Sequence, residues 1–242
     1  MKKIILTVII AMFFLPVFVW AENLTFAVVE WPPIVIVNNG QIEGISVDIT
    51  REVCKRIGIQ PKFELLPLKR AFKYLKDGKI CMASLFYNEK RDKFLYYPSE
   101  YQYNVRNVII ALKKNGSKVN HLDDLKDKNI GVITEYHYGD KFNNYQDFKR
   151  VQVRELSYLI KLLKNGRVDF IAAEENGFKY KCKQLNIQDI FEIVYTISEK
   201  PFYTVFPKKM GQRGSEIAEK FGNTLQQMRK EGVIQNIINK YH

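Results

Sequence analysis

The chain has 242 residues, of which 46% are hydrophobic and 13% aromatic, so it can bury a sizeable core and is not expected to be disordered. Its formal net charge is +12, but the lysines and arginines are spread along the chain without a dense basic run. This distribution is typical of a solvated surface, and we expect no nucleic-acid partner.

The first 21 residues have the order of a secretory signal peptide. Lys2 and Lys3 supply positive charge, residues 4–19 are almost wholly apolar, and small residues precede a predicted cut after Ala21. The apolar stretch is about 16 residues long, shorter than the roughly 17–25 residues of a membrane-spanning helix. We therefore predict that residues 1–21 are removed and that the remaining chain acts in the periplasm.

The following stretch alternates strands with helices. Residues 25–29, 62–66 and 80–85 are short apolar runs that indicate strands. Helical spacing of apolar residues marks 47–58 and the segment that Pro67 opens. This alternation predicts an α/β fold, with a largely parallel sheet and helices on its faces.

Part of this pattern returns 88 residues later. The helix, glycine stop, basic residue and strand of 68–80 recur in register at 156–168. The apolar positions that match are Leu68, Ala71, Phe72 and Leu75 with Leu156, Leu159, Ile160 and Leu163. The repeat predicts two similarly built lobes.

Two further strands, 107–113 and 202–206, end at breakers and are interpreted as crossings between the lobes. The predicted first lobe comprises 22–112 and 201–242, and the second lobe comprises 113–200. Two crossings make a hinge, and a cleft between lobes is a common place for a ligand. The helical tail, 215–241, is expected to pack on the first lobe.

The chain contains three cysteines, Cys54, Cys81 and Cys182, each inside an apolar pattern. An odd number without close spacing favours three buried thiols, with one bridge plus a free thiol as the alternative. No metal-ligand spacing is present, so no metal or cofactor is expected.

A series of short motifs resembles the extracellular solute-binding proteins, family 3, over residues 24–242. The motifs are Trp31-Pro32-Pro33, residues 40–49, residues 78–80, Asn88-Glu89-Lys90-Arg91, residues 97–101, residues 166–169 and residues 228–232. The resemblance implies a type II periplasmic-binding-protein fold, with two α/β lobes joined by a two-strand hinge. It also implies a monomer that captures a small polar solute, an amino acid or a related compound, for the membrane permease of an ABC transporter.

In the first lobe, the resemblance assigns Arg91 to the ligand's α-carboxylate, which suits a planar guanidinium fork. Ser84 and Phe86 lie at the end of a predicted strand, where ligands of α/β sheets bind. Trp31 is expected to act as an aromatic lid, with Glu30 at the mouth of the cleft.

In the second lobe, Glu174 matches a position where family members carry an acidic residue that pairs with the ligand's ammonium group. Arg70, in the first lobe, is a further basic candidate near the rim of the cleft. Residues 134–139 depart from the family, because Tyr136, His137 and Tyr138 stand where small residues usually offer backbone N–H groups. We expect these aromatic side chains, Tyr136 above all, to reshape the pocket away from that of an ordinary α-amino acid.

Three functions are therefore open. A passive binding protein without catalytic residues is the leading interpretation. An exported enzyme on the same fold, similar to cyclohexadienyl dehydratases, would use Glu174, Glu135 or His137 as acid or base. A ligand-sensing partner of a membrane receptor is the third.

Overall fold

The structure is a computed structural model that describes residues 22–242, so the predicted signal peptide lies outside the described residues. No helix within 22–242 is both long and apolar enough to cross a membrane. The elements are β1 (Glu22–Val28), β2 (Ile36–Asn38), β3 (Gln41–Glu43), α2 (Ile45–Arg56), β4 (Ile59–Leu65), α3 (Leu68–Asp77), β5 (Cys81–Phe86), α4 (Glu89–Asp92), β6 (Leu95–Tyr96), β7 (Tyr103–Leu112), β8 (Asn129–Ile133), α5 (Asp140–Asn144), β9 (Lys149–Val153), α6 (Leu156–Lys164), β10 (Phe170–Glu174), α7 (Glu175–Leu185), β11 (Phe191–Pro207), α8 (Gly211–Lys230) and α9 (Val233–Lys240).

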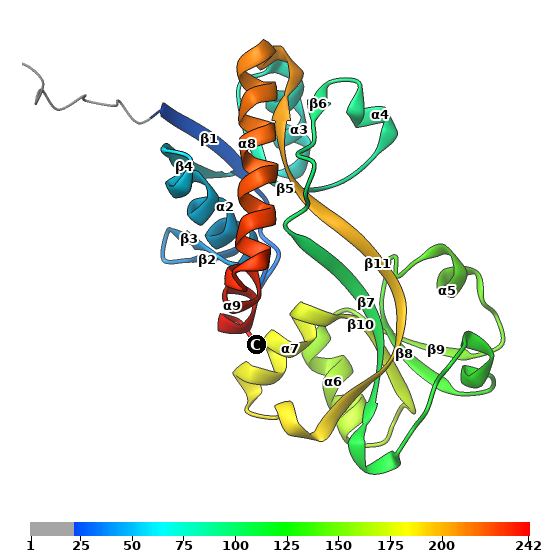
Figure 1. The fold of residues 1–242 in the computed structure, drawn as a ribbon. Helices are drawn as coiled ribbons and strands as arrows, with labels where there is room; N and C mark the ends of the chain where they lie inside the picture. The colour runs from blue at the N-terminus through cyan, green and yellow to red at the C-terminus, as the bar shows by residue number, and fades with distance from the viewer. Residues whose placement is uncertain (1–21) are drawn as a thin grey trace, which may run out of the picture.

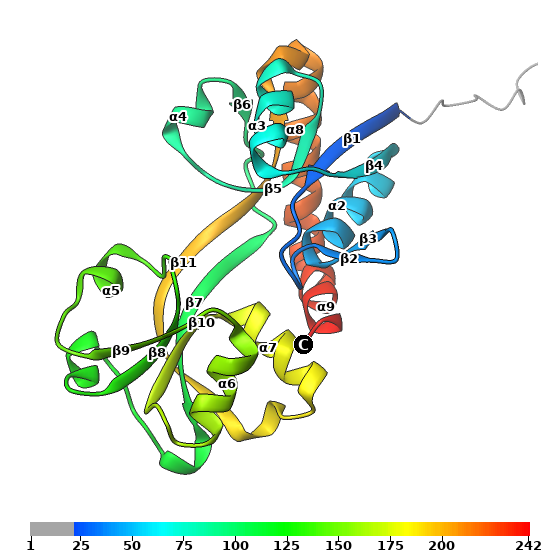
Figure 2. The same ribbon diagram turned by 180° about the vertical axis from the view of Figure 1, so that it is seen from behind.

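The main sheet has the order β4-β1-β5-β11-β7-β10-β8-β9, which reads as two copies of one arrangement that meet at β11 and β7. In the first lobe, β1 pairs in parallel with β4 and β5, and β11 runs antiparallel to β5. In the second lobe, β8 pairs in parallel with β9 and β10, and β7 runs antiparallel to β10. Figures 1 and 2 show the two lobes separated along the long strands β7 and β11. The predicted two-lobed α/β fold is confirmed.

The repeat of 88 residues is also confirmed. The unit β4-α3-β5 of the first lobe corresponds to β9-α6-β10 of the second. Gly78 and Gly166 follow the two helices at φ 79° and 65°, a left-handed conformation that favours glycine. The same helix stop therefore occurs at the same place in each lobe.

Each lobe buries its own core on both faces of its half of the sheet, because successive strand residues point to opposite faces. Phe26 and Val28 of β1 pack in a cluster with residues of α2 and α8, whereas Ala27 packs with residues of α3. In β7, Val108 packs with residues of α6 and α7, whereas Ile109 packs with Phe142 of α5 and its neighbours. The central strands are thus covered on both sides, which explains their near-continuous apolar runs.

The two strands that join the lobes are longer than the sequence predicts. β7 begins at Tyr103 rather than 107, and β11 starts at Phe191, well before the predicted strand 202–206. Charged residues and Pro201 interrupt the apolar pattern of β11. The ladder to β7, which pairs Phe191 with Leu112 and Phe202 with Tyr103, holds the long strand together.

The division of buried residues between the two cores indicates where the chain crosses from one lobe to the other. Val105 packs in the first lobe and Val108 in the second, and their partners on β11 are Lys200 and Thr196. We propose that the crossings lie between these pairs, so that the first crossing precedes the boundary expected at residue 112.

The helical tail and the thiols agree with expectation. Helices α8 and α9 are separated by Gly232 at φ 74°, and their apolar stripe packs in the core of the first lobe. Figure 1 shows α8 along the first lobe and α9 reaching down towards α7. Cys54, Cys81 and Cys182 are buried and free.

Candidate ligand-binding cleft

Trp31 is a shared wall of three cavities on one side of the hinge. The first-lobe cavity, of about 240 Å³, is also lined by Ser84, Phe86 and Arg91. The Glu174 cavity, of about 190 Å³, lies between Trp31 and residues of the second lobe. The middle cavity, of about 250 Å³, contains Trp31 and Phe86 from the first lobe and Tyr136 from the second. Six of the eight predicted site residues therefore line these three cavities: Trp31, Ser84, Phe86, Arg91, Tyr136 and Glu174.

Arg91 lies on the short helix α4, which begins where the Asn88 side chain accepts a hydrogen bond of 3.0 Å from the Lys90 backbone N–H. Its guanidinium carbon lies 4.6 Å from the centre of the Phe72 ring, and its Nη1 donates to the Phe86 carbonyl at 3.4 Å. These contacts hold the side chain at the wall of the first-lobe cavity. A guanidinium has five N–H donors, so most of them are free for a ligand.

The remainder of the first-lobe cavity is largely apolar. The Trp31 ring lies 6.4 Å from Phe86 and 6.0 Å from Phe202, measured between centroids. Ser84 is a buried polar side chain on this wall. One cation and one hydroxyl above aromatic rings form a site suited to a small ligand with an anionic group and an apolar part.

Glu174 ends β10 and caps helix α7. Its Oε1 accepts from the Asn176 backbone N–H at 3.0 Å and from Asn176 Nδ2 at 3.1 Å, and its Oε2 accepts from the Gly177 N–H at 2.6 Å. A carboxylate accepts about four hydrogen bonds, so one acceptor position is left for a ligand donor. Burial raises the pKa of Glu174 to about 7, because a desolvated carboxylate is costly.

The loop between β8 and α5 uses its backbone N–H groups internally. The Ile133 N–H donates to Tyr138 Oη at 2.8 Å, and Asn143 Oδ1 accepts from the N–H groups of Tyr138 and Gly139. Tyr136 Oη lies 3.2 Å from Asn107 Oδ1 and donates to it. Several N–H groups of this loop therefore already have partners within the protein.

Glu30 and Arg70 are exposed and are not among the residues that line these three cavities. Arg70 lies on α3, whose buried residues are Ala71 and Leu75, so its own side chain faces away from the core. The roles assigned to Glu30 and Arg70 stay predictions.

Sequence reasoning missed several polar residues of the cleft, among them Arg154, Asn107, Ser198 and Lys200. Arg154 directly follows β9 and lines the Glu174 cavity. The rule that ligands bind beyond strand ends, which pointed to Ser84, applies equally to Arg154. Asn107 lines the middle cavity, and its Nδ2 donates to the Tyr138 carbonyl at 3.0 Å. Because Asn107 lies inside a strand and not at its end, the strand-end rule could not have identified it.

Two α/β lobes that face each other across a cleft, joined by two antiparallel strands, define a two-lobed solute-binding protein of the type II periplasmic class. The chain belongs to the bacterial extracellular solute-binding proteins, family 3, whose family model matches residues 24–242.

Individual relatives are distant. The chain is 26% identical to the putative ABC transporter arginine-binding protein 2 of Escherichia coli K12, over 100% of this chain and 99% of that protein. It is 24% identical to the histidine-binding periplasmic protein of the same strain, over 84% and 80%. The structure of the L-cystine solute receptor of Neisseria gonorrhoeae superposes with a TM-score of 0.76 at 17% identity, over 91% and 92%, a likeness of fold.

Proposed function

We propose that this chain is an exported monomer that captures an amino acid between its lobes and delivers it to the membrane permease of an ABC transporter. One observation carries the proposal: a cation, Arg91, and a carboxyl group, Glu174, stand in different lobes beside cavities that share Trp31. An amino acid has a carboxylate and an ammonium group that complement this pair. The names of the relatives, which bind histidine, arginine or L-cystine, support the same ligand class.

The division of the site between lobes supplies a mechanism. A ligand that contacts both Arg91 and Glu174 binds more tightly when the lobes close, so it shifts the population towards the closed form. A ligand that contacted one lobe alone would not change the population of the closed form. The closed form is the species that a permease can distinguish from the free protein.

A thermal-shift screen of L-arginine, L-histidine, L-cystine and the other common amino acids tests this proposal. A ligand at 100 times its dissociation constant stabilises the folded protein by roughly 2.7 kcal/mol, which raises Tm by about 5 to 10 °C for a chain of this size. The absence of any shift across the whole panel would contradict the amino-acid class.

The variant Arg91→Ala should bind the identified ligand about 10 to 100 times more weakly, because a charged hydrogen bond is lost. Titration calorimetry measures the difference, and Arg167→Ala, which removes an exposed arginine, is the matched control. Equal affinity of Arg91→Ala and the unmodified protein would show that the carboxylate binds elsewhere.

We further propose that the protein leaves its ligand chemically unchanged and that its mature chain begins at Glu22. Mass spectrometry tests both points. Ligand released from the denatured protein should have its original mass, and the protein from the periplasmic fraction should lack residues 1–21. A modified ligand would favour an enzyme instead.

A further inference from the structure

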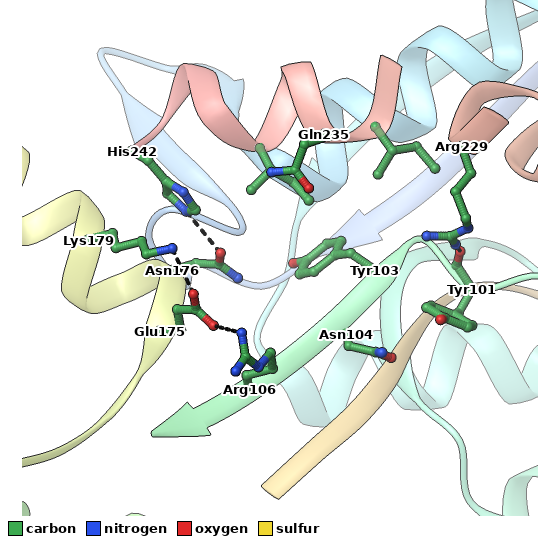
Figure 3. Close-up of a pocket in the computed structure, with 12 residues that line it drawn as sticks. Tyr101, Tyr103, Asn104, Arg106, Glu175, Asn176, Lys179, Arg229, Gln235 and His242 are labelled. Carbon is green, nitrogen blue, oxygen red and sulfur yellow. Dashed lines mark hydrogen bonds and ion pairs between the residues drawn. The ribbon is translucent and has the colours of Figure 1, made fainter. Parts of the chain in front are cut away.

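A fourth cavity lies on the other side of the hinge strands. This rear cavity has a volume of about 380 Å³ and is lined by both lobes (Figure 3). In β7, Val105 and Asn107 line the middle cavity of the ligand cleft, whereas Asn104 and Arg106 line the rear cavity. Because alternate residues of a strand point to opposite faces, these four residues place the two cavities on opposite faces of β7. Tyr103, the first residue of the strand, also lines the rear cavity.

The segment that follows α9 is fixed to the first lobe. Tyr241 is buried, and its Oη donates to Asp48 Oδ2 at 2.7 Å and accepts from the Gly44 N–H at 3.0 Å. Lys240 Nζ forms an ion pair with the same Asp48 oxygen at 2.9 Å. This part of the chain therefore moves with helix α2 and the first lobe.

The same segment bonds to helix α7 of the second lobe at two points. His242 Nε2 lies 2.9 Å from Asn176 Oδ1, and Lys183 Nζ donates to the Lys240 carbonyl at 2.9 Å. In Figure 3, the His242 side chain points towards Asn176 at one end of the rear cavity. These two contacts link the lobes on the rear side of the hinge.

Asn176 connects the rear contact with the ligand cleft. Its Nδ2 donates to Glu174 Oε1, which leaves its Oδ1 to accept from His242, so the proton of the imidazole lies on Nε2. Burial and the nearby Lys179 lower the pKa of His242 to about 4, so the imidazole is neutral near pH 7. One amide side chain thus contacts both Glu174 at the front and His242 at the rear.

We expect closure of the cleft to pull the rear contacts apart. Figures 1 and 2 show α7 and the end of α9 on one side of β7 and β11, with α4 and α5 on the other. A bend of the two strands that brings α4 towards α5 moves α9 away from α7. A hydrogen bond of 2.9 Å is lost once its atoms separate beyond about 3.5 Å.

We infer that Lys240 and His242 form a rear latch with Lys183 and Asn176, which holds the lobes apart and lowers ligand affinity, and that Asn176 is a positioning residue coupling this latch to Glu174. The inference rests on the proposed function only in that a ligand closes the cleft. Binding energy is spent on breaking the latch, so the apparent affinity lies below the affinity of the closed form.

The latch can be tested without any ligand, by measuring the distance between the lobes. Spin labels on Lys76→Cys of α3 and Lys141→Cys of α5, both exposed positions, report this distance by pulsed electron resonance. The buried native thiols are protected from labelling. The His242→Ala variant should show a larger population with short distances than the unmodified protein. An unchanged distribution in a folded variant would overturn the inference.

Ligand affinity gives a second, independent readout. His242→Ala should bind the amino acid from the screen about 3 to 10 times more tightly, the factor that corresponds to one net neutral hydrogen bond. His242→Gln, whose amide N–H can donate to Asn176, should return towards the original affinity. His121→Ala, at an exposed histidine of the second lobe, is the matched control and should change nothing. Equal or weaker binding by His242→Ala would contradict the latch.

The coupling through Asn176 is tested by a double-mutant cycle. Asn176→Ala removes the partner of His242, so adding His242→Ala to it should not increase affinity further. Fully additive effects would show that His242 acts without Asn176. If no amino acid binds the unmodified protein, the proposed function fails, but the distance measurement still decides whether the latch exists.

Discussion

Glu174 combines a structural contact with a place in the wall of the cleft. Its carboxyl group caps helix α7 through the N–H groups of Asn176 and Gly177 and lines the cleft. Gly177 has no side chain to interfere, since a Cβ there would lie 3.2 Å from Glu174 Oε2. The family resemblance identified the acidic position, but only the structure shows that burial shifts its titration towards neutral pH.

Ligand binding should therefore release protons. The pKa of Glu174 in the free protein is about 7, raised from 4.5 by burial, and a ligand ammonium group favours the charged carboxylate. Below about pH 7, affinity should fall as the pH falls, because binding must displace the proton from Glu174. Calorimetry at about pH 6.5 in buffers of different ionisation enthalpy measures the release. Identical heats in all buffers would contradict this assignment.

The stability of the free protein should depend on pH in the opposite direction from its ligand affinity. The unfolded chain loses this proton near pH 4.5, whereas the free folded protein keeps it until about pH 7. The contribution of Glu174 to stability is therefore fully present below about pH 4.5 and is lost as the pH rises through about 7. A ligand ammonium group bound at Glu174, as proposed, should offset this loss by stabilising the carboxylate.

The three thiols should be inert in the native protein. Burial raises the pKa of Cys54, Cys81 and Cys182 to about 12, so at pH 8 almost no thiolate forms and reagents cannot reach the sulfur. A colorimetric thiol reagent should react with three groups after unfolding in guanidinium and with almost none before. Rapid reaction of the folded protein would show that at least one thiol is accessible.

At the scale of elements, α8 illustrates packing that periodicity alone cannot predict. Its apolar stripe, from Ile217 to Met228, lies within the predicted helical tail, and Phe221 and Leu225 are fully buried. Gly222 on the same helix lies against Ser99, where an added Cβ would come within 2.5 Å of Oγ and 3.0 Å of the backbone N. The helix approaches the segment after β6 as closely as it does because this position lacks a side chain.

Gly222→Ala should therefore destabilise the protein by about 1 to 3 kcal/mol, as overpacked sites do. In an exposed helix interior, the same change would stabilise by up to about 1 kcal/mol. Urea unfolding measures the change in free energy of unfolding. Lys220→Ala, at an exposed position two residues earlier on the same helix, is the control, and its change should be close to zero. A more stable Gly222→Ala variant would show that Ser99 moves aside at little cost.

On the scale of the whole molecule, the two lobes line the ligand cleft with different residues, and the main chain connects them through two strands. β7 and β11 pair along their length from Tyr103–Phe202 to Leu112–Phe191 and cross from one core to the other. Such a connection bends more readily than either lobe deforms, because each lobe has a close-packed core on both faces of its sheet.

A bound ligand should make the molecule more compact. Small-angle X-ray scattering should give a smaller radius of gyration with saturating amino acid than without it, because the lobes rotate towards each other. At a ligand concentration that just saturates the unmodified protein, the Arg91→Ala variant should show a smaller decrease in radius, because a smaller fraction of it is bound. An identical radius for the free and saturated protein would mean that binding occurs without closure.

The sequence by itself determined the α/β class, the repeat and the family, because periodicity, glycine stops and motif order are local properties of the chain. The rule that ligands bind at strand ends pointed to Ser84 and Phe86, and the family resemblance pointed to Glu174. The tertiary structure decided the length of β11, which depends on its ladder with β7, and brought Arg154 and Asn107 into the cleft. It also placed His242 beside Asn176, which lies 66 residues earlier. Contacts between such distant residues arise only when the lobes are assembled, so no local pattern records them.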